Sequence, residues 1–577
     1  MSRGKRFIAA TVVALALPVL VPASAGAHAA LLKAVPAASG ILNGPPAALK
    51  LTYSEAVEPR FAVVSVTDKS GNRVATARPS RSPRNVAELD VPLKDLKTGW
   101  YLVYWRVISI DGHPVRGAYT FAVGPNPGAP PEFKVPSLAE TAATPGLVVT
   151  RWIVLLSLMA AIGLLVFRLI IARPLVRRVP EASLRSVTVA FAASVAVALL
   201  STLVYVLMAT AEFAQVSFFD FGTTLPGIRD SSFGRGYSDL AIIVALLAVA
   251  AAAALWVDRP QREQRSVAEL VALGGALAAA SAALLVPGLA GHAGTYSPRG
   301  ASLLLDWTHV LAGSLWVGGL IGLTVVAWKA GARRVASMVM LVPRFSRVAF
   351  ASVLALIASG TIAAIIRLPT LASLWDTGFG QALVVKIGLL LAALVLAAVN
   401  LLRTKPRLEA LDRHPGLGEP TAAALRRLVG GEIALVAGAV FAAAIMSSLA
   451  PPPRALAEIG TAAAKVGPGV VDKRIDHAGY QLQIGVNPNK ATIPNKFSIK
   501  VTKDGKPVTG ADVTGKFTML DMDMGPLTYK FDELAPAVYG DPDLPALVMV
   551  GHWGLDFTIT PPGGKPVRAL LIDKAGG

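Results

Sequence analysis

The chain of 577 residues contains no cysteine. This absence excludes disulfide bonds, thiolate zinc sites and thiol redox chemistry, so any bound metal must be held by histidine, methionine, carboxylate or backbone groups. The sequence also lacks a phosphate-binding GxxxxGK[ST] loop, which argues against ATP-driven transport. Charged residues make up only 16% of the chain and hydrophobic residues 54%. A chain of this length and composition is expected to be a membrane protein with more than one domain.

Eight apolar runs after Pro145 each approach the roughly 20 residues that a helix needs to cross the hydrocarbon core of a bilayer. We place them at about residues 148–172, 187–211, 238–257, 267–289, 302–328, 348–366, 381–402 and 429–449. Arginine and lysine concentrate in every second connecting segment, beginning with the one after the first run. Because basic loops stay in the cytoplasm, both ends of the chain are predicted outside. The net charge of +19 then reflects topology, and we expect a lipid bilayer rather than nucleic acid as partner.

The first 27 residues have the features of a secretory signal peptide: a basic start, an apolar run and a small-residue cleavage site at Ala25–Ala27. Cleavage there makes His28 the first residue of the mature chain. Its amine and imidazole can then chelate one metal, and flat, nitrogen-rich coordination suits Cu(II). The alternative is that a histidine at this position is accidental, because cleavage sites tolerate many residues.

A second metal-binding candidate is the segment Ser109–Pro114, which contains Asp111 and His113. In extended backbone these two side chains lie on one face. A carboxylate and an imidazole would complete a four-ligand Cu(II) set with His28. If the segment is a turn instead, Asp-Gly-His-Pro is an ordinary connector.

The fold class that follows is a multidomain membrane protein with two extracytoplasmic β-domains. Short alternating strands separated by glycine, proline and aspartate turns predict a β-sandwich near each end of the chain. A proline-rich segment after the first sandwich reads as an extended linker. The predicted order is a signal peptide at 1–27, a β-sandwich at 28–124, a linker at 125–146, an eight-helix transmembrane domain at 147–450, a linker at 451–474 and a second β-sandwich at 475–577.

Three ionisable residues near the outer ends of the fourth and fifth apolar runs are candidates for a metal path. Asp306 and His309 share a helix face, and His292 lies one short loop away. Ionisable residues within a membrane span are costly and usually face a bundle interior or a water-filled path. The alternative is an Asp–His pair that only links helices. Weaker candidates are Met208, Glu212 and Lys386, the last with a charge that Asp306 could neutralise.

The C-terminal region contains a cluster of methionines that predicts a Cu(I) site. Met522 and Met524 share one face of an extended strand, and thioether ligands select Cu(I). Met549 and His552 complete the candidate set. The alternative is core packing, the commoner role of methionine, but the interleaved aspartates favour a single methionine face.

At the N-terminal end, the segments His28–Leu31, Val35–Gly40, Leu51–Val57 and Trp105–Val115 resemble the CopC copper-binding domain nearly end to end. The resemblance implies a Cu(II) site made by the amine and imidazole of His28 together with Asp111 and His113. Some relatives also have a methionine-rich Cu(I) site in this domain. Residues 28–124 contain no methionine, so only Cu(II) is expected here.

The rest of the chain resembles two further families, and a CopC–CopD fusion is implied. The membrane region resembles the CopD permease family over all eight spans, through Gly291–Gly294, Asp306–His309 and Gly313–Gly319. The C-terminal region resembles a YtkA-type domain through Met519–Met524 and Met549–Trp553.

These features together predict a multi-pass protein of the cell membrane that captures Cu(II) outside and moves copper inward. The C-terminal domain would receive or buffer Cu(I), and an extracytoplasmic copper chaperone or reductase is a candidate partner. The alternatives are copper tolerance or export, delivery to a membrane cuproenzyme, and sensing. An N-terminal histidine with a second histidine also resembles oxidative polysaccharide-cleaving enzymes, but their substrate face needs a larger, aromatic-studded domain. We therefore expect no enzymatic activity.

Overall fold

The computed structural model describes residues 31–576 apart from several short segments. The segments outside it are 39, 54–55, 75–77, 95, 109–113, 129–130, 132, 134–143, 215, 224–231, 291–297, 330–332, 411–417, 450–451, 453–461, 478, 492, 521–525, 545 and 549–550. The helices form one compact unit, Ala142–Arg367 with Leu374–Leu449, distinct from the β-regions. Each region is described below by itself.

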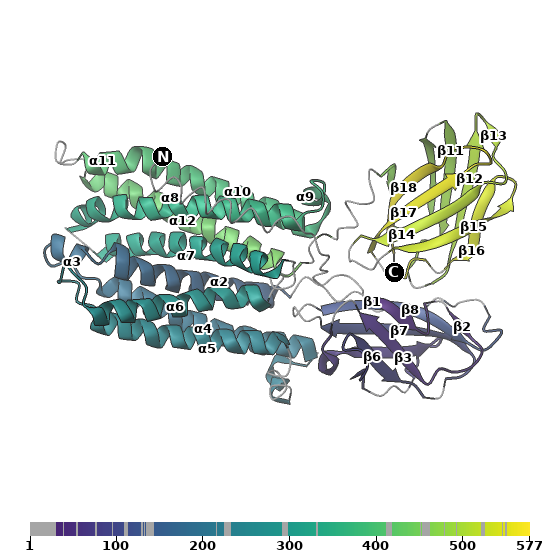
Figure 1. Cartoon of the computed structure of the whole chain (residues 1–577), viewed down its shortest axis with the longest axis horizontal. Coiled ribbons are helices and arrows are strands. Elements are labelled where there is room, and N and C mark those ends of the chain that lie inside the picture. Colours follow the sequence, from purple (N-terminus) through teal and green to yellow (C-terminus); the bar gives the residue numbers. More distant parts are fainter. Residues whose placement is uncertain are drawn as a thin grey trace. The chain divides into compact units, whose positions relative to one another are not determined.

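The N-terminal β-region is a sandwich of two four-stranded sheets, as predicted (Figure 1). One sheet has the strand order β1 (Leu31–Val35), β3 (Ala48–Tyr53), β6 (Glu88–Pro92), β5 (Ser80–Arg81), and the other has the order β2 (Ile41–Leu42), β8 (Pro114–Val123), β7 (Gly99–Ile108), β4 (Val63–Asp68). A 3-10 turn, η2, covers Pro59–Phe61. Alternate residues of β3 are buried, and the ring of Tyr53 meets Trp105 of the opposite sheet edge to face at 5.5 Å. This period of two builds one apolar core between the sheets.

The C-terminal β-region is a continuous antiparallel path of strands that ends in one parallel pair. The path runs β10 (Val471–His477), β11 (Tyr480–Asn487), β12 (Asn495–Lys503), β16 (Val538–Leu544), β15 (Leu527–Ala535), β14 (Asp512–Met519), β17 (Gly551–Thr560), β18 (Val567–Ala575), β9 (Ala464–Val466), with β13 (Lys506–Pro507) paired to β12. Phe517 lies at the centre of its core, with its ring 5.1 Å from that of Phe497 and 5.4 Å from that of Phe557. The strand β15 pairs on both sides and joins the two halves of the fold.

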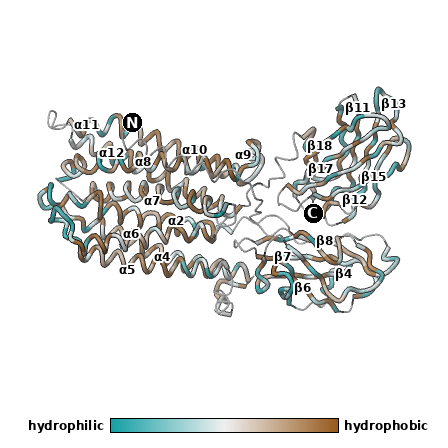
Figure 2. The backbone as a smooth tube through the Cα atoms, viewed as in Figure 1, coloured by the Kyte–Doolittle hydropathy of each residue, from teal (hydrophilic) through white to brown (hydrophobic). Residues whose placement is uncertain are grey.

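Among the described residues, eight helices are long and apolar enough to cross a membrane, which agrees with the eight predicted runs. They are α2 (Pro145–Val166), α4 (Arg185–Ala214), α5 (Ser232–Val257), α6 (Val267–Ala290), α7 (Arg299–Lys329), α8 (Arg334–Arg367), α10 (Gly378–Val399) and α12 (Gly418–Met446). The shorter helical elements are η3 (Phe167–Ile171), α3 (Leu175–Arg178), η4 (Phe218–Thr223), α9 (Ser373–Asp376), η8 (Asn400–Thr404) and α11 (Lys405–Glu409). Figure 2 shows hydrophobic residues along the length of the helices and hydrophilic residues at their ends.

The helices α2 and α7 form the centre of the bundle, between α4, α5 and α6 on one side and α8, α10 and α12 on the other (Figure 1). Their backbones approach closely at Gly163 and Gly318, where a methyl group on either glycine would overlap the other helix. Small residues at a helix contact allow this approach, which supplies packing that the lipid environment does not drive.

Two helices extend beyond the predicted runs. Helix α8 begins at Arg334 rather than near residue 348. Pro343, Arg344 and Arg347 interrupt the apolar pattern of the sequence, but the helix continues through Pro343. The helix after α9 continues past residue 402 through the π-helical turn η8 into α11, and the span as a whole reaches Leu408.

Candidate metal centre

The described residues next to the predicted Cu(II) ligands lie at one end of the N-terminal sandwich. Strand β1 begins at Leu31, which pairs with Tyr53 at the end of β3. Ile108 pairs with Pro114, so residues 109–113 connect the paired ends of the β7–β8 hairpin. The N–H of Glu58, shortly after β3, donates to the carbonyl of Ile108 at 3.0 Å. The chain therefore enters β1 and turns between β7 and β8 at the same end.

The three predicted ligands themselves, His28, Asp111 and His113, lie outside the described residues. The hairpin register shows that the 109–113 segment is a connection between antiparallel strands. A connection at the end of a sandwich is where binding residues commonly lie.

In the helical bundle, Asp306 and His309 lie on α7 one turn apart and are both half-buried. The carboxylate of Asp306 approaches α6 at Gly288, where a methyl group would lie 2.9 Å from Oδ2. The indole of Trp307 donates to the carbonyl of Ser281 at 3.1 Å and fixes α7 against α6. A larger residue than glycine at position 288 would displace the Asp306 carboxylate.

His309 faces α8 and α10. Its Nδ1 lies 3.1 Å from Oγ of Ser359, and its Nε2 lies 3.4 Å from Nζ of Lys386. Ser359 already donates its hydroxyl proton to the carbonyl of Ala355 at 2.6 Å, so it accepts a proton from Nδ1. Nε2 therefore carries the lone pair and accepts from the Lys386 ammonium. Gly360 gives the ring room, since a methyl group there would lie 3.1 Å from Cε1.

Lys386, a weaker candidate from the sequence, thus lies in the centre of this site. It is half-buried, and Asp306 attracts its charge while Arg367 repels it. In chemical terms the site offers one imidazole nitrogen and one carboxylate, with an ammonium group against the nitrogen.

The third predicted member of this site, His292, lies outside the described residues. The described residues contain no group of three histidine, aspartate or glutamate side chains arranged to hold a metal ion. Gly288, near the end of α6, lies against the Asp306 carboxylate.

The other two weaker candidates, Met208 and Glu212, lie near the end of α4 and contact the start of α2. Oγ1 of Thr150 lies 3.5 Å from the Met208 sulfur, and Oγ1 of Thr144 donates to Glu212 at 2.8 Å. Both side chains therefore have partners that fix α4 to α2.

In the C-terminal domain, His552 is the one predicted ligand among the described residues; Met522, Met524 and Met549 lie outside them. His552 is exposed on β17, and its carbonyl accepts the N–H of Leu520 at 2.7 Å. The chain therefore enters the 521–525 segment directly beside His552.

Sequence reasoning missed a polar cluster around Arg151 of α2. Its guanidinium donates to the hydroxyl of Tyr205 on α4 at 3.0 Å and to the hydroxyls of Ser447 and Ser448, each at 3.0 Å, at the end of α12. The ring of Tyr205 lies 4.6 Å from that of Tyr237 on α5. An arginine inside the first apolar run was the available signal, because such residues normally face a bundle interior.

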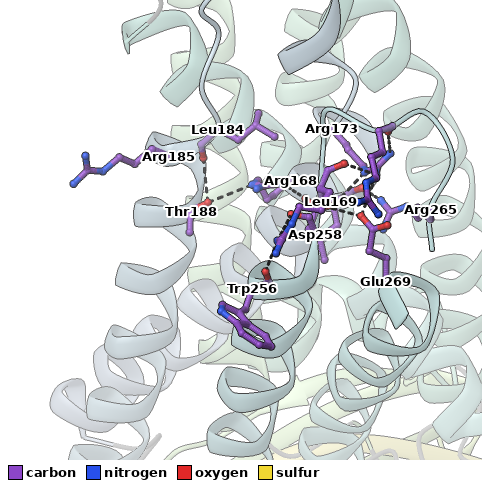
Figure 3. Close-up of polar contacts among 12 residues, drawn as sticks. Arg168, Leu169, Arg173, Leu184, Arg185, Thr188, Trp256, Asp258, Arg265 and Glu269 are labelled. Atoms are coloured by element: carbon purple, nitrogen blue, oxygen red, sulfur yellow. Dashed lines mark hydrogen bonds and ion pairs between the residues drawn. The ribbon is translucent and has the colours of Figure 1, made fainter. Parts of the chain in front are cut away.

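A second cluster that the sequence did not reveal joins the other ends of α2, α5 and α6 (Figure 3). Arg168 and Arg173 both bind Asp258, at 2.8 and 3.0 Å, and Arg173 also reaches Glu269 at 3.3 Å. Glu269 accepts the backbone N–H groups of Arg259 and Ser266, each at 2.7 Å. Arg173, counted in the sequence as an inner-loop charge, is 6% exposed and belongs to a buried ion network.

A third buried polar pair joins α12 to the π-helical turn after α10. The amide of Asn400 donates to the carboxyl of Glu432, which is 2% exposed. A glutamate within the eighth apolar run was again a signal in the sequence.

Known protein-family models together match most of the chain. Models of four domains match: the CopC domain at residues 31–124, the copper resistance protein D-like N-terminal domain at 141–297, copper resistance protein D at 339–446 and a YtkA-like domain at 476–537. The matches follow the order of the β-sandwich, the helical bundle and the second β-domain.

Two curated relatives and one solved structure illustrate the similarity. The copper transport protein CutJ of Bacillus subtilis (strain 168) is 27% identical over 543 residues, 93% of each chain. Protein YobA of Escherichia coli (strain K12) is 40% identical over 105 residues, 18% of this chain and 85% of that protein. The crystal structure of CopC from Methylosinus trichosporium OB3b is 30% identical, covers 19% of this chain and 100% of that chain, and has a TM-score of 0.16. The chain belongs to the family of copper transport and resistance proteins in which a CopC domain is fused to a CopD membrane domain.

Proposed function

We propose that this protein captures Cu(II) outside the cell through His28, Asp111 and His113 and moves copper inward through the helical bundle. The observation that carries the proposal is the half-buried pair Asp306 and His309 on α7, one of the two central helices. A carboxylate and an imidazole with a defined lone pair are copper ligands. Their place between helices, rather than on an extramembrane surface, favours translocation over capture alone.

The order of the domains supports uptake. With both ends outside, the Cu(II) ligands, the Asp306–His309 site and the C-terminal site all lie at or beyond the outer face of the membrane. An inside-negative potential favours inward movement of a cation by about 2.3 kcal/mol per elementary charge per 100 mV. This driving force fits a chain that lacks a nucleotide-binding loop.

We infer a supporting role for the C-terminal domain as a Cu(I) site. Met522, Met524 and Met549 supply soft thioether ligands, and His552 supplies an imidazole beside the segment that contains two of them. Conversion of Cu(II) to Cu(I) needs one electron, so an extracytoplasmic reductase, or a chaperone that already holds Cu(I), is the partner that fits. The role is binding and transfer of copper, with no enzymatic reaction by this chain.

The test is cellular copper in cells that express the intact chain, a His28→Ala variant and an Asp306→Ala/His309→Ala variant, at matched membrane levels and under copper limitation. We expect the intact chain to raise cellular copper and both variants to lose the effect. Thr308→Ala is the matched control on α7, because the Thr308 hydroxyl is bonded within its own helix, to Leu304 at 2.7 Å. Lower copper with the intact chain would reverse the direction to export or tolerance. Unchanged copper would favour delivery to a membrane cuproenzyme or sensing.

A further inference from the structure

Lys386 is the only charged residue of α10 between Gly378 and Val399. A lysine in an otherwise apolar span is costly and is normally retained for a function. Its Nζ lies 3.4 Å from Nε2 of His309. Nε2 is the ring nitrogen that has a lone pair available for a metal. The ammonium therefore lies where a copper ion bound to His309 would have to lie.

The remaining contacts of His309 leave no second position for copper on this ring. Nδ1 is directed to Ser359, whose own proton is bonded to Ala355. Copper can reach this imidazole only through Nε2, and only when the ammonium has left it.

Charge balance supports the same exchange. Asp306 attracts Lys386 and Arg367 repels it, so in the copper-free site the tethered cation lies near one carboxylate and a second cation. Replacing that cation with another monovalent cation leaves the local charge unchanged. Adding a cation without removing the first leaves an uncompensated positive charge, which is costly in a low-dielectric environment. Cu(I) carries the same single charge as the ammonium.

We propose that Lys386 is a tethered cation that occupies the copper position at His309 in the copper-free bundle and is displaced when Cu(I) binds. This inference rests on the proposed function, because it requires Asp306 and His309 to be copper ligands. Lys386 keeps the two ligands charge-balanced while the site is empty and returns when copper has left, which opposes rebinding from the same side. It is a positioning residue that acts on the affinity of the site.

The test is the affinity of the full-length chain for Cu(I), measured by competition with a bicinchoninate chelator under ascorbate. A Met522→Leu/Met524→Leu/Met549→Leu background removes the thioether ligands of the proposed C-terminal Cu(I) site. If the ammonium occupies Nε2 in about nine molecules of ten, Lys386→Leu, which removes the cation and adds no metal ligand, tightens Cu(I) binding by about ten-fold. His309→Ala removes this gain, and Lys386→Arg, which keeps a cation, stays close to the parent. Lys405→Leu at the inner end of the same span is the matched control and is expected to change nothing.

Unchanged or weaker binding in Lys386→Leu, while His309→Ala still lowers binding, overturns the tethered-cation role and makes Lys386 a structural support. No effect of His309→Ala in either background overturns the ligand assignment in the proposed function, and the exchange with it. A second measurement leaves Lys386 unchanged, so it does not depend on whether a Lys386 variant folds. Cu(I) should increase labelling of Lys386 by a small, membrane-permeant acylating reagent. The increase is expected in the parent and not in His309→Ala, and equal labelling with and without Cu(I) in the parent contradicts displacement.

Discussion

Arg173 and Asp258 form an ion pair in which Nε lies 3.0 Å from Oδ1 and both side chains are nearly fully buried. The same carboxylate binds Arg168 at 2.8 Å. One aspartate after α5 thereby fixes two arginines that follow α2, and Glu269 at the start of α6 completes the cluster. The cluster ties the α5–α6 hairpin to the central helix at the predicted cytoplasmic side.

Removing one partner from this cluster is expected to be costly. Asp258→Asn leaves two buried guanidinium groups without their shared carboxylate, and breaking a buried ion pair in this way costs about 3–5 kcal/mol. Thermal unfolding of the detergent-solubilised chain should show a clear drop in midpoint. Glu263→Gln is the control, because its side chain is 88% exposed and lies 3.8 Å from Arg177. Its expected effect is about 0–1 kcal/mol. Equal stability of the two variants would show that the cluster contributes little.

The contact between α2 and α7 should depend on the absence of side chains at its glycines. Gly163→Ala or Gly318→Ala places a methyl group against the backbone of the other helix, so the two central helices must separate. Overpacking of this kind costs about 1–3 kcal/mol. The same thermal unfolding measurement applies, with Gly274→Ala of α6 as control, since a methyl group there meets nothing within 4 Å. Loss of stability in the control and none at Gly163 would contradict this account of the packing.

Periodicity and composition predicted much of the fold. Continuous apolar runs located all eight spans, because a helix in lipid must satisfy its own backbone and be apolar over a fixed length. The strand pattern of β3 and β4 predicted the N-terminal sandwich for an equally local reason, the alternation of more and less buried positions. The start of α8 at Arg334 was missed because Pro343 and the two arginines that follow it suggest a helix boundary, which the structure does not have.

The polar sites were only partly predictable, because their members come from different helices. The spacing of Asp306 and His309 identified a shared face, but the partners Ser359 and Lys386 depend on how α8 and α10 pack against α7. Lys386 was a candidate only as a lone charge in an apolar run. Arg151 and Glu432 gave the same kind of signal, and only tertiary packing supplies the identity of their partners.

Asp573 of the C-terminal domain is expected to make that domain sensitive to pH. Burial raises the pKa of its carboxyl from the ordinary 3.8 to about 6. Three weaker effects lower this pKa: a hydrogen bond from Asn489, one from the backbone of Lys574, and the nearby charge of His552. The amide of Asn489 donates to Oδ1 at 2.8 Å, while Oδ2 of Asp573 and Oδ1 of Asn489 have no hydrogen-bond partner among the described residues. A proton on Oδ2 would let this group donate and so removes the cost of burying a charge.

The folded domain therefore binds this proton more tightly than the unfolded chain does. The resulting stability is fully present below pH 3.8 and is lost as the pH rises through about 6. Hydrogen–deuterium exchange of β18 in the full-length chain, corrected for the intrinsic pH dependence of exchange, should show less protection above pH 6 than at pH 4. Asp573→Asn should flatten this dependence, and Asp556→Asn on the neighbouring strand should not. A dependence that persists in Asp573→Asn would assign the effect to another group.

Cu(II) binding at the N-terminal domain is expected to require a free amine on His28. The predicted chelate joins that amine to the imidazole of the same residue, with Asp111 and His113 from the β7–β8 connection as further ligands. Mass spectrometry of the mature chain should find His28 as its first residue.

Acetylating the amine, or adding one residue before it, removes one nitrogen ligand and leaves every side chain in place. We expect Cu(II) affinity to fall by at least about ten-fold, which corresponds to 1.4 kcal/mol. The nitrogen coupling in the electron paramagnetic resonance spectrum should change with it. His477→Ala, at an exposed histidine of β10, is the control and should leave both readouts unchanged. A blocked amine with full affinity and an unchanged spectrum would place Cu(II) on side chains alone, and His28→Ala would then show whether the imidazole takes part.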